Sequence, residues 1–247
     1  MCHAMPDNHV ELTAHPAPVA EQAGRSRTFL QREILLLLLA VAVFVALGTI
    51  AGEYGSDRVD VAVTRDLQSV QWPPLAWLLV HVSDVGFQPL AALSYIVVAL
   101  CLVLVRLPLE AVIAVGGSGL AVLVGGVVKL LVRRMRPTAS LVHVVGHLTD
   151  YSFPSGHVVH YTTLFGFALY VVYVTWQGSL LKRSVVLVLL TLIALVGPSR
   201  VYLGQHWATD VTAAYLFGGV WLAAMIELHL LLKQRFKRGW RRPAWSA

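Results

Sequence analysis

Two histidines in this chain lie beside groups that could make them reactive. His206 and Asp210 are four residues apart in "SRVYLGQHWATD", so a helix would place both side chains on one face. Asp210 could then accept the Nδ1 hydrogen of His206 and leave Nε2 free to act as a nucleophile. The other histidine, His157, closes the short stretch "PSGH" at the start of an apolar run. We predict that His157 is a general acid, which donates a proton to the oxygen that the nucleophile displaces from the substrate.

Cations and a helix start provide the charge for an anion site. Lys129 and Arg136 are seven residues apart in "KLLVRRMRP", which is two helical turns, so both are predicted to point the same way. With Arg200 they make three cations, which would repel one another unless an anion lay between them. Guanidinium and ammonium groups suit phosphoryl oxygens. Ser155 and Gly156 begin the next apolar helix, where free N–H groups and the helix dipole favour an anion.

The helix that carries Lys129 is predicted to pack closely against its neighbours. Gly117, Ala121 and Gly125 recur every four residues and form a stripe of small side chains that ends at Lys129. Arg134 lies off this stripe, and we expect it to face lipid headgroups. A divalent metal between the histidines and Asp210 is disfavoured by the nearby cations.

The composition indicates an integral membrane protein. Of 247 residues, 57% are hydrophobic and only 13% are charged, and the mean hydropathy is +0.70. The net charge of +6 does not point to nucleic acid, because the basic residues cluster at the ends of apolar runs. Cys2 lies in a polar stretch and Cys101 in an apolar one, so no disulfide is expected.

Hydropathy predicts an all-α membrane protein, a bundle of six transmembrane helices. The spans are expected at about residues 33–52, 88–106, 110–133, 155–177, 184–203 and 206–232. They make up a domain over residues 31–233, between a flexible cytoplasmic tail at 1–30 and a basic cytoplasmic tail at 234–247. The stretch "WPPLAWLLVHV" at 72–82 is too short to span and is predicted to be an interfacial helix.

The distribution of positive charge predicts the orientation. Most of the 19 Lys and Arg fall on one side if both termini are cytoplasmic, as expected for a multi-pass protein of the cell membrane. The three motif stretches then lie together at the extracytoplasmic ends of spans three to six. The active site is therefore predicted to face the extracytoplasmic side.

These motifs resemble the three signatures of the type 2 phosphatidic acid phosphatase superfamily. The pattern is Lys, six residues, Arg-Pro; then Pro-Ser-Gly-His; then Ser-Arg, five residues, His, three residues, Asp. Every fixed position is filled. The resemblance implies a metal-independent phosphatase without a cofactor, in which His206 forms a phosphohistidine, His157 protonates the leaving group and Asp210 orients His206. The phosphate-binding residues that it implies are Lys129, Arg136, Ser155, Gly156 and Arg200.

Several functions stay compatible with this interpretation. The expected substrate is a phospholipid or prenyl phosphate, with a phosphatidic acid type favoured. Undecaprenyl pyrophosphate, a lipid A phosphate and transfer of the phosphoryl group to an alcohol remain alternatives. An anion transporter would use the same cations as a binding ring, but it does not explain why Asp210 is placed beside His206. The surrounding membrane lipids are expected partners and nucleic acid is not. The sequence leaves the oligomeric state open.

Overall fold

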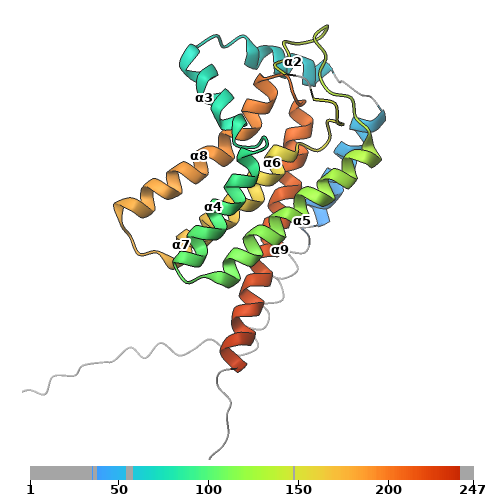
Figure 1. Cartoon of the computed structure of the whole chain (residues 1–247). Coiled ribbons are helices and arrows are strands. Elements are labelled where there is room, and N and C mark those ends of the chain that lie inside the picture. Colours follow the sequence, from blue (N-terminus) through green and yellow to red (C-terminus); the bar gives the residue numbers. More distant parts are fainter. Residues whose placement is uncertain (1–34, 36–37, 54–57, 147, 240–247) are drawn as a thin grey trace, which may run out of the picture. The chain divides into compact units, whose positions relative to one another are not determined.

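The computed structural model describes residues 35, 38–53, 58–146 and 148–239. The chain divides into two compact units, Met1–Leu39 and Ala40–Ala247. The predicted tail at 1–30 lies outside the described residues, and every helix from α2 onward belongs to the second unit. The regular structure of this unit is helical, and no strand occurs in the described part of the chain (Figure 1).

The helices match the predicted apolar segments closely. A helix at Leu38–Glu53 precedes α2. The remaining elements are α2 (Arg58–Gln68), α3 (Pro73–Asp84), α4 (Leu90–Leu104), α5 (Pro108–Val132), α6 (Gly156–His160), the π-helix η1 (Tyr161–Phe165), α7 (Gly166–Thr175), α8 (Leu180–Tyr202) and α9 (Ala208–Gly239). The stretch at 72–82 forms α3, as expected for a short helix. The last helix continues past residue 232, where the sixth span was predicted to end.

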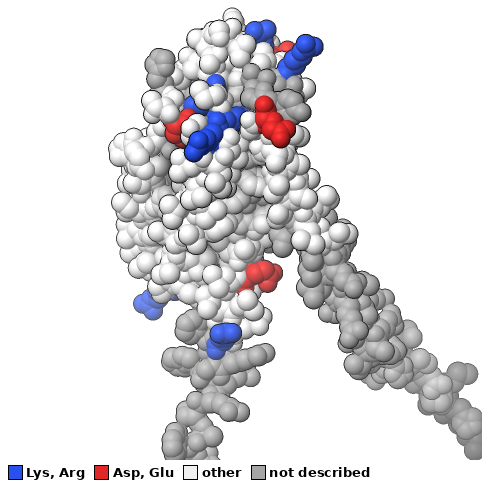
Figure 2. Space-filling model, turned by 90° about the vertical axis from the view of Figure 1, so that its right-hand side faces the viewer, with Lys and Arg blue, Asp and Glu red and all other residues white. Residues whose placement is uncertain are grey.

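Four helices in the described residues are long and apolar enough to cross a membrane. They are Pro108–Val132, Gly156–Thr175, Leu180–Tyr202 and Ala208–Arg235. A bent pair, Leu38–Glu53 with Arg58–Gln68, makes a fifth if it counts as one span, and α4 is shorter. Figure 2 shows charged side chains gathered towards two ends of one face, with uncharged residues between them. The protein is therefore a multi-pass membrane protein, while the count of six spans stays a prediction.

The segment Gly156–Thr175 is the central helix of the bundle. Of its most apolar stretch, 72% is buried, against 33% or less in the other three spans. It runs without interruption through α6, η1 and α7, and every residue of the π-helix is buried. A π-helical turn often marks a functional site. Here it lies one turn beyond His157, so the most deeply packed helix carries a predicted site residue at its start.

The end of α5 differs from the prediction. The helix stops at Val132, because Arg133 adopts a left-handed backbone conformation (φ 54°) and its N–H bonds to Lys129 O. The residues after it are irregular. The expectation that Lys129 and Arg136 share one helical face is therefore wrong, and Arg136 reaches the site from a loop.

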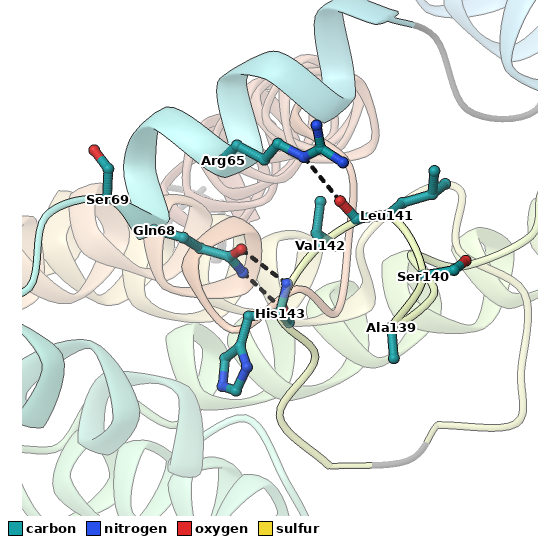
Figure 3. A pocket seen from close by; sticks show the side chains of 8 residues that line it. All are labelled: Arg65, Gln68, Ser69, Ala139, Ser140, Leu141, Val142 and His143. Atoms are coloured by element: carbon teal, nitrogen blue, oxygen red, sulfur yellow. Dashed lines mark hydrogen bonds between the residues drawn. The ribbon is translucent and has the colours of Figure 1, made fainter.

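The long connection between α5 and α6 is anchored to α2. Figure 3 shows Arg65 and Gln68 pointing at this loop across a surface pocket of about 420 Å³. Arg65 Nε donates to Leu141 O (2.9 Å), and Gln68 exchanges hydrogen bonds with the backbone of His143 (2.7 and 3.0 Å). None of the predicted site residues lines this pocket. Its contacts fix the loop that delivers Arg136.

Candidate active site

The predicted site residues gather around one cavity. It has a volume of about 430 Å³, within the range of small-molecule sites. Six of the eight line it directly: Lys129, Arg136, Gly156, His157, Arg200 and His206. The other two adjoin them, since Ser155 precedes Gly156 and Asp210 lies behind His206. The cavity draws these residues from α5, α6, α8 and two loops.

Backbone carbonyls hold two of the three cations at the cavity. Lys129 Nζ donates to Tyr151 O (2.7 Å). Arg136 donates from Nε to Asp150 O (2.8 Å) and from Nη1 to Gln205 O (2.5 Å). The Asp150 carboxylate also pairs with both cations, at 2.6 Å from Lys129 and 2.7 Å from Arg136. The loops before α6 and α9 therefore position the charges that the motifs supply.

His206 presents one ring nitrogen to the cations and the other to Asp210. Arg136 Nη1 lies 3.1 Å from His206 Nε2. A guanidinium only donates, so Nε2 is the acceptor and the ring hydrogen is on Nδ1. Nδ1 faces Ser152 Oγ at 3.4 Å and Asp210 Oδ2 at 3.6 Å. Burial, followed by the charges of Arg136 and Arg200, lowers the pKa of His206 well below its ordinary value. The ring is neutral, as a nucleophilic nitrogen requires.

Asp210 is held by several donors rather than by His206 alone. Its Oδ2 accepts from Ser152 Oγ (2.5 Å) and from the backbone N–H of Trp207 (2.8 Å). His206 itself precedes α9, so the turn before the helix joins the pair, and not a shared helical face. Ser152 bridges the two side chains, and nothing in the sequence singled it out.

Arg134 is buried, so the expectation that it faces lipid headgroups is wrong. Only 3% of it is exposed. It donates to Asp210 Oδ1 (2.6 Å) and to Asp60 Oδ2 (2.5 Å). The left-handed turn at Arg133 swings the chain inward, whereas a continued helix would have turned Arg134 outward. A guanidinium shared by two buried carboxylates fixes the orientation of Asp210.

The connection between α3 and α4 forms a wall of the cavity. Gly86 lies against the His157 ring, where an added Cβ would come within 2.1 Å of Cδ2. The Phe87 ring meets the His157 ring edge-on, with centroids 4.5 Å apart, and lies 4.9 Å from Arg200 Cζ. Arg200 Nη1 donates to Ser83 Oγ (2.5 Å). Sequence reasoning missed Gly86 and Phe87 in this wall, and Ser83 in α3 beside it, because packing alone connects them to the motifs.

Several polar atoms at the cavity are buried without a hydrogen-bond partner among the described residues. They are Ser155 Oγ, His157 Nε2, and Arg200 Nε and Nη2. Such atoms are uncommon, because each costs free energy when nothing satisfies it. A Cβ added to Gly156 would meet no described atom within 4 Å, so packing does not demand glycine there. The arrangement is able to surround an oxyanion that supplies the missing acceptors.

The electrostatics of the cavity favour an anion. Its lining combines the three cations with the single carboxylate of Asp150. In the described part of the chain, no group of three or more His, Cys, Asp or Glu side chains could hold a metal ion. A neutral His206 facing fixed cations can attack an electrophile whose developing charge those cations stabilise.

Comparison with known proteins identifies the family and the fold of this chain. Residues 109–234 match the PAP2 superfamily. A transmembrane PAP2 type phosphatidylglycerolphosphate phosphatase from Bacillus subtilis has a similar structure, with a TM-score of 0.66 and 22% identity over 78% of this chain and 95% of that one. LpxE of Aquifex aeolicus gives a TM-score of 0.56 and 18% identity over 70% of this chain and 98% of that one. At these identities, the two structures establish the fold.

Proposed function

The chain belongs to the PAP2 superfamily, and on this premise we propose that it is a membrane phosphatase that hydrolyses a lipid phosphomonoester through a phosphohistidine. One observation carries the proposal. A neutral His206 faces the same cavity as the buried Arg200, two of whose nitrogens have no hydrogen-bond partner among the described residues. The favoured substrate is of the phosphatidic acid type.

The amphiphilic lining of the cavity supports a lipid substrate. One part carries the cations and histidines. The other part is formed largely by small and apolar residues of α4 and α5, among them Ala91, Val122, Gly125 and Gly126. Val122 is 37% exposed on the outer surface of α5. A phosphate among the cations and an apolar chain along α4 and α5 would match this division.

In the first step, His206 Nε2 attacks phosphorus and forms a P–N bond while the P–O bond to the lipid breaks. The departing oxygen takes a proton from His157, so the lipid leaves as an alcohol. Asp210 stabilises the positive charge on the His206 ring through Nδ1, directly or through Ser152. Fixed guanidinium groups stabilise the charge on the equatorial oxygens.

In the second step, water attacks phosphorus and the P–N electron pair returns to His206. The now neutral His157 takes a proton from this water, which restores both histidines and releases phosphate. Lys129, Arg136 and Arg200 occupy the place of a charge-neutralising metal ion. We therefore propose that the reaction needs no metal. From the distribution of Lys and Arg along the chain, we also propose that the cavity faces the extracytoplasmic side.

The test is phosphate release by detergent-purified protein in EDTA. We would compare phosphatidic acid, phosphatidylglycerol phosphate and undecaprenyl pyrophosphate as substrates. The expected result is release that survives EDTA, prefers a monophosphate and falls by about 10⁴-fold or more in His206→Ala. A phosphorylated intermediate that is stable in base and labile in acid would identify the phosphohistidine.

His143→Ala is the matched control, because this exposed histidine lies outside the cavity. It is expected to keep wild-type activity. Full activity in His206→Ala would overturn the assigned nucleophile, and loss of activity in EDTA that zinc or magnesium restores would overturn metal independence.

A further inference from the structure

Asp150 places its carboxylate where two oxygens of a phosphoryl group are expected. It lies in the loop before α6 and lines the cavity. Its Oδ2 pairs with Lys129 Nζ at 2.6 Å and its Oδ1 with Arg136 Nη2 at 2.7 Å. One oxygen per cation is also how a phosphate bridges two basic side chains. The carboxylate therefore occupies the cations that the signature motifs provide.

The cations do not need this carboxylate to stay in place. Lys129 is also bound by Tyr151 O, and Arg136 by Asp150 O and Gln205 O. These acceptors belong to the backbone and remain when the Asp150 side chain moves. The Asp150 carboxylate accepts from Arg136 Nη2, whereas the backbone carbonyls accept from Nε and Nη1. A departing carboxylate would leave both cations positioned and open to a ligand.

The Asp150 side chain is well placed to leave. It is 56% exposed, against 14% for the Lys129 side chain and 12% for that of Arg136. Water therefore reaches one partner of each ion pair, and such pairs contribute little to stability. Burial opposes ionisation of Asp150, but its hydrogen bonds and the charges of Lys129 and Arg136 lower its pKa to about 2. The group is an anion at any ordinary pH.

We propose that Asp150 is a specificity-determining residue, an internal anion that a phosphomonoester dianion displaces and a phosphodiester monoanion does not. This inference rests on the proposed function and narrows its substrate class. Exchange of one single-charged anion for another gains no attraction from the cations. Exchange for a dianion adds a second negative charge beside Lys129, Arg136 and Arg200.

The membrane makes this selection necessary. The common phospholipids carry a phosphodiester with one negative charge, and they surround the protein in large excess over any lipid with a terminal phosphate. A terminal phosphate has a second pKa near 6 and is largely a dianion at neutral pH. Without Asp150, the abundant diesters would compete for the cations. With it, the site stays closed to them.

The experiment measures binding, so it does not depend on turnover. Full-length protein in neutral detergent is titrated with inorganic phosphate, and the rise in unfolding temperature reports binding. Phosphatidylglycerol is then added to the micelles as a diester competitor. The variants are Asp150→Asn, which removes the charge, and Asp150→Glu, which keeps it. Asp66→Asn removes an exposed carboxylate outside the cavity and is the matched control.

Asp150→Asn is expected to bind phosphate about threefold more tightly, because two partly exposed ion pairs together contribute only a modest free energy. Phosphatidylglycerol should displace phosphate from this variant but not from the wild type, Asp150→Glu or the control. Unchanged or weaker phosphate binding in a folded Asp150→Asn would overturn the inference. So would tighter phosphate binding without competition by the diester. Absence of lipid hydrolysis by the wild type would instead overturn the proposed function, and the binding data would stand apart from it.

Discussion

The two ends of the helix bundle differ in how completely their buried polar groups are paired within the protein. Glu110 lies in the first turn of α5 and Lys129 lies near its other end, about 28 Å away along the helix. At the Glu110 end, Oε1 accepts from His229 Nε2 (3.0 Å) and from Lys233 Nζ (2.7 Å). The other ring nitrogen of His229 lies 3.2 Å from Tyr170 OH. Each of these charged groups has a partner within the protein.

At the Lys129 end, some polar groups form fewer hydrogen bonds than they are able to. Within the described residues, the buried His157 Nε2, two nitrogens of the buried Arg200 and the Ser155 hydroxyl have no hydrogen-bond partner there. An unsatisfied buried polar group costs about 1–3 kcal/mol, so a protein retains it only where something else supplies the partner. The difference indicates that buried polar groups with partners inside the protein stabilise the fold. Buried polar groups without such partners indicate a ligand site. Substitutions at the two ends should therefore separate activity from stability.

Among substitutions that test this difference between the two ends, Arg200→Met is expected to have the largest effect. Loss of two donors aimed at the phosphoryl group should lower kcat by about 10²–10³-fold. The unfolding temperature should stay level or rise, because a buried cation with unpartnered nitrogens is replaced by an apolar chain. Phosphate release and scanning fluorimetry in detergent measure the two quantities. Arg58→Met, on an exposed side chain outside the cavity, is the control. A large drop in unfolding temperature with activity retained would mean that Arg200 stabilises the fold and does not serve the ligand.

The opposite result is expected for Glu110→Gln. This change leaves His229 and Lys233 without a carboxylate in a site where Glu110 is only 2% exposed. Because Lys233 is 40% exposed and Gln still offers an acceptor oxygen, the loss of stability should be about 1–2 kcal/mol. The specific activity of the folded fraction should not change. Glu227→Gln, an exposed acid on the same stretch of α9, should alter neither quantity. Activity lost at an unchanged unfolding temperature would mean that this end also takes part in the reaction.

A smaller effect is expected for Phe87→Ala, in the wall of the site. Phe87 packs against both His157 and Arg200, so its loss should let the two groups shift. We expect kcat to fall about tenfold with KM nearly constant, and the pH–rate profile to move. Phe87→Leu, which keeps an apolar wall, should recover most of the activity. A rise in KM at constant kcat would indicate that Phe87 contacts the substrate instead of positioning His157.

Sequence patterns predicted which residues meet at the cavity better than they predicted the contacts that hold those residues in place. Lys129, His157 and His206 meet at one cavity because side-chain type and apolar periodicity already placed them at neighbouring helix ends. The position of Arg134 depended on where α5 ends. That end depends on one left-handed residue, Arg133, for which glycine or asparagine is the usual signal.

Long-range packing was beyond the reach of local patterns. Asp60 pairs with Arg134 across 74 residues of chain, and Ser83 with Arg200 across 117. Neither acceptor lies in a recognisable motif, and Asp60 has the appearance of an ordinary acid at the start of an exposed helix. These contacts join α2 to the loop after α5 and α3 to α8, which periodicity within one helix does not encode.

The smallest effect is expected for Asp150→Asn. This variant tests whether one carboxylate can both stabilise the fold and give up its cations to a ligand. The pKa of Asp150 is lowered from 3.8 to about 2, so its ion pairs stabilise the fold fully above about pH 4. That contribution is lost as the pH falls towards 2 and the carboxylate takes up a proton. Because the side chain is exposed, the loss at neutral pH should stay under about 1 kcal/mol. The unfolding temperatures of wild type and Asp150→Asn should thus differ slightly at pH 6 and converge near pH 2.

A variant that is slightly less stable yet binds phosphate more tightly would show that Asp150 satisfies the cations only until a ligand arrives. Equal stability at both pH values would mean that these ion pairs contribute nothing to the fold.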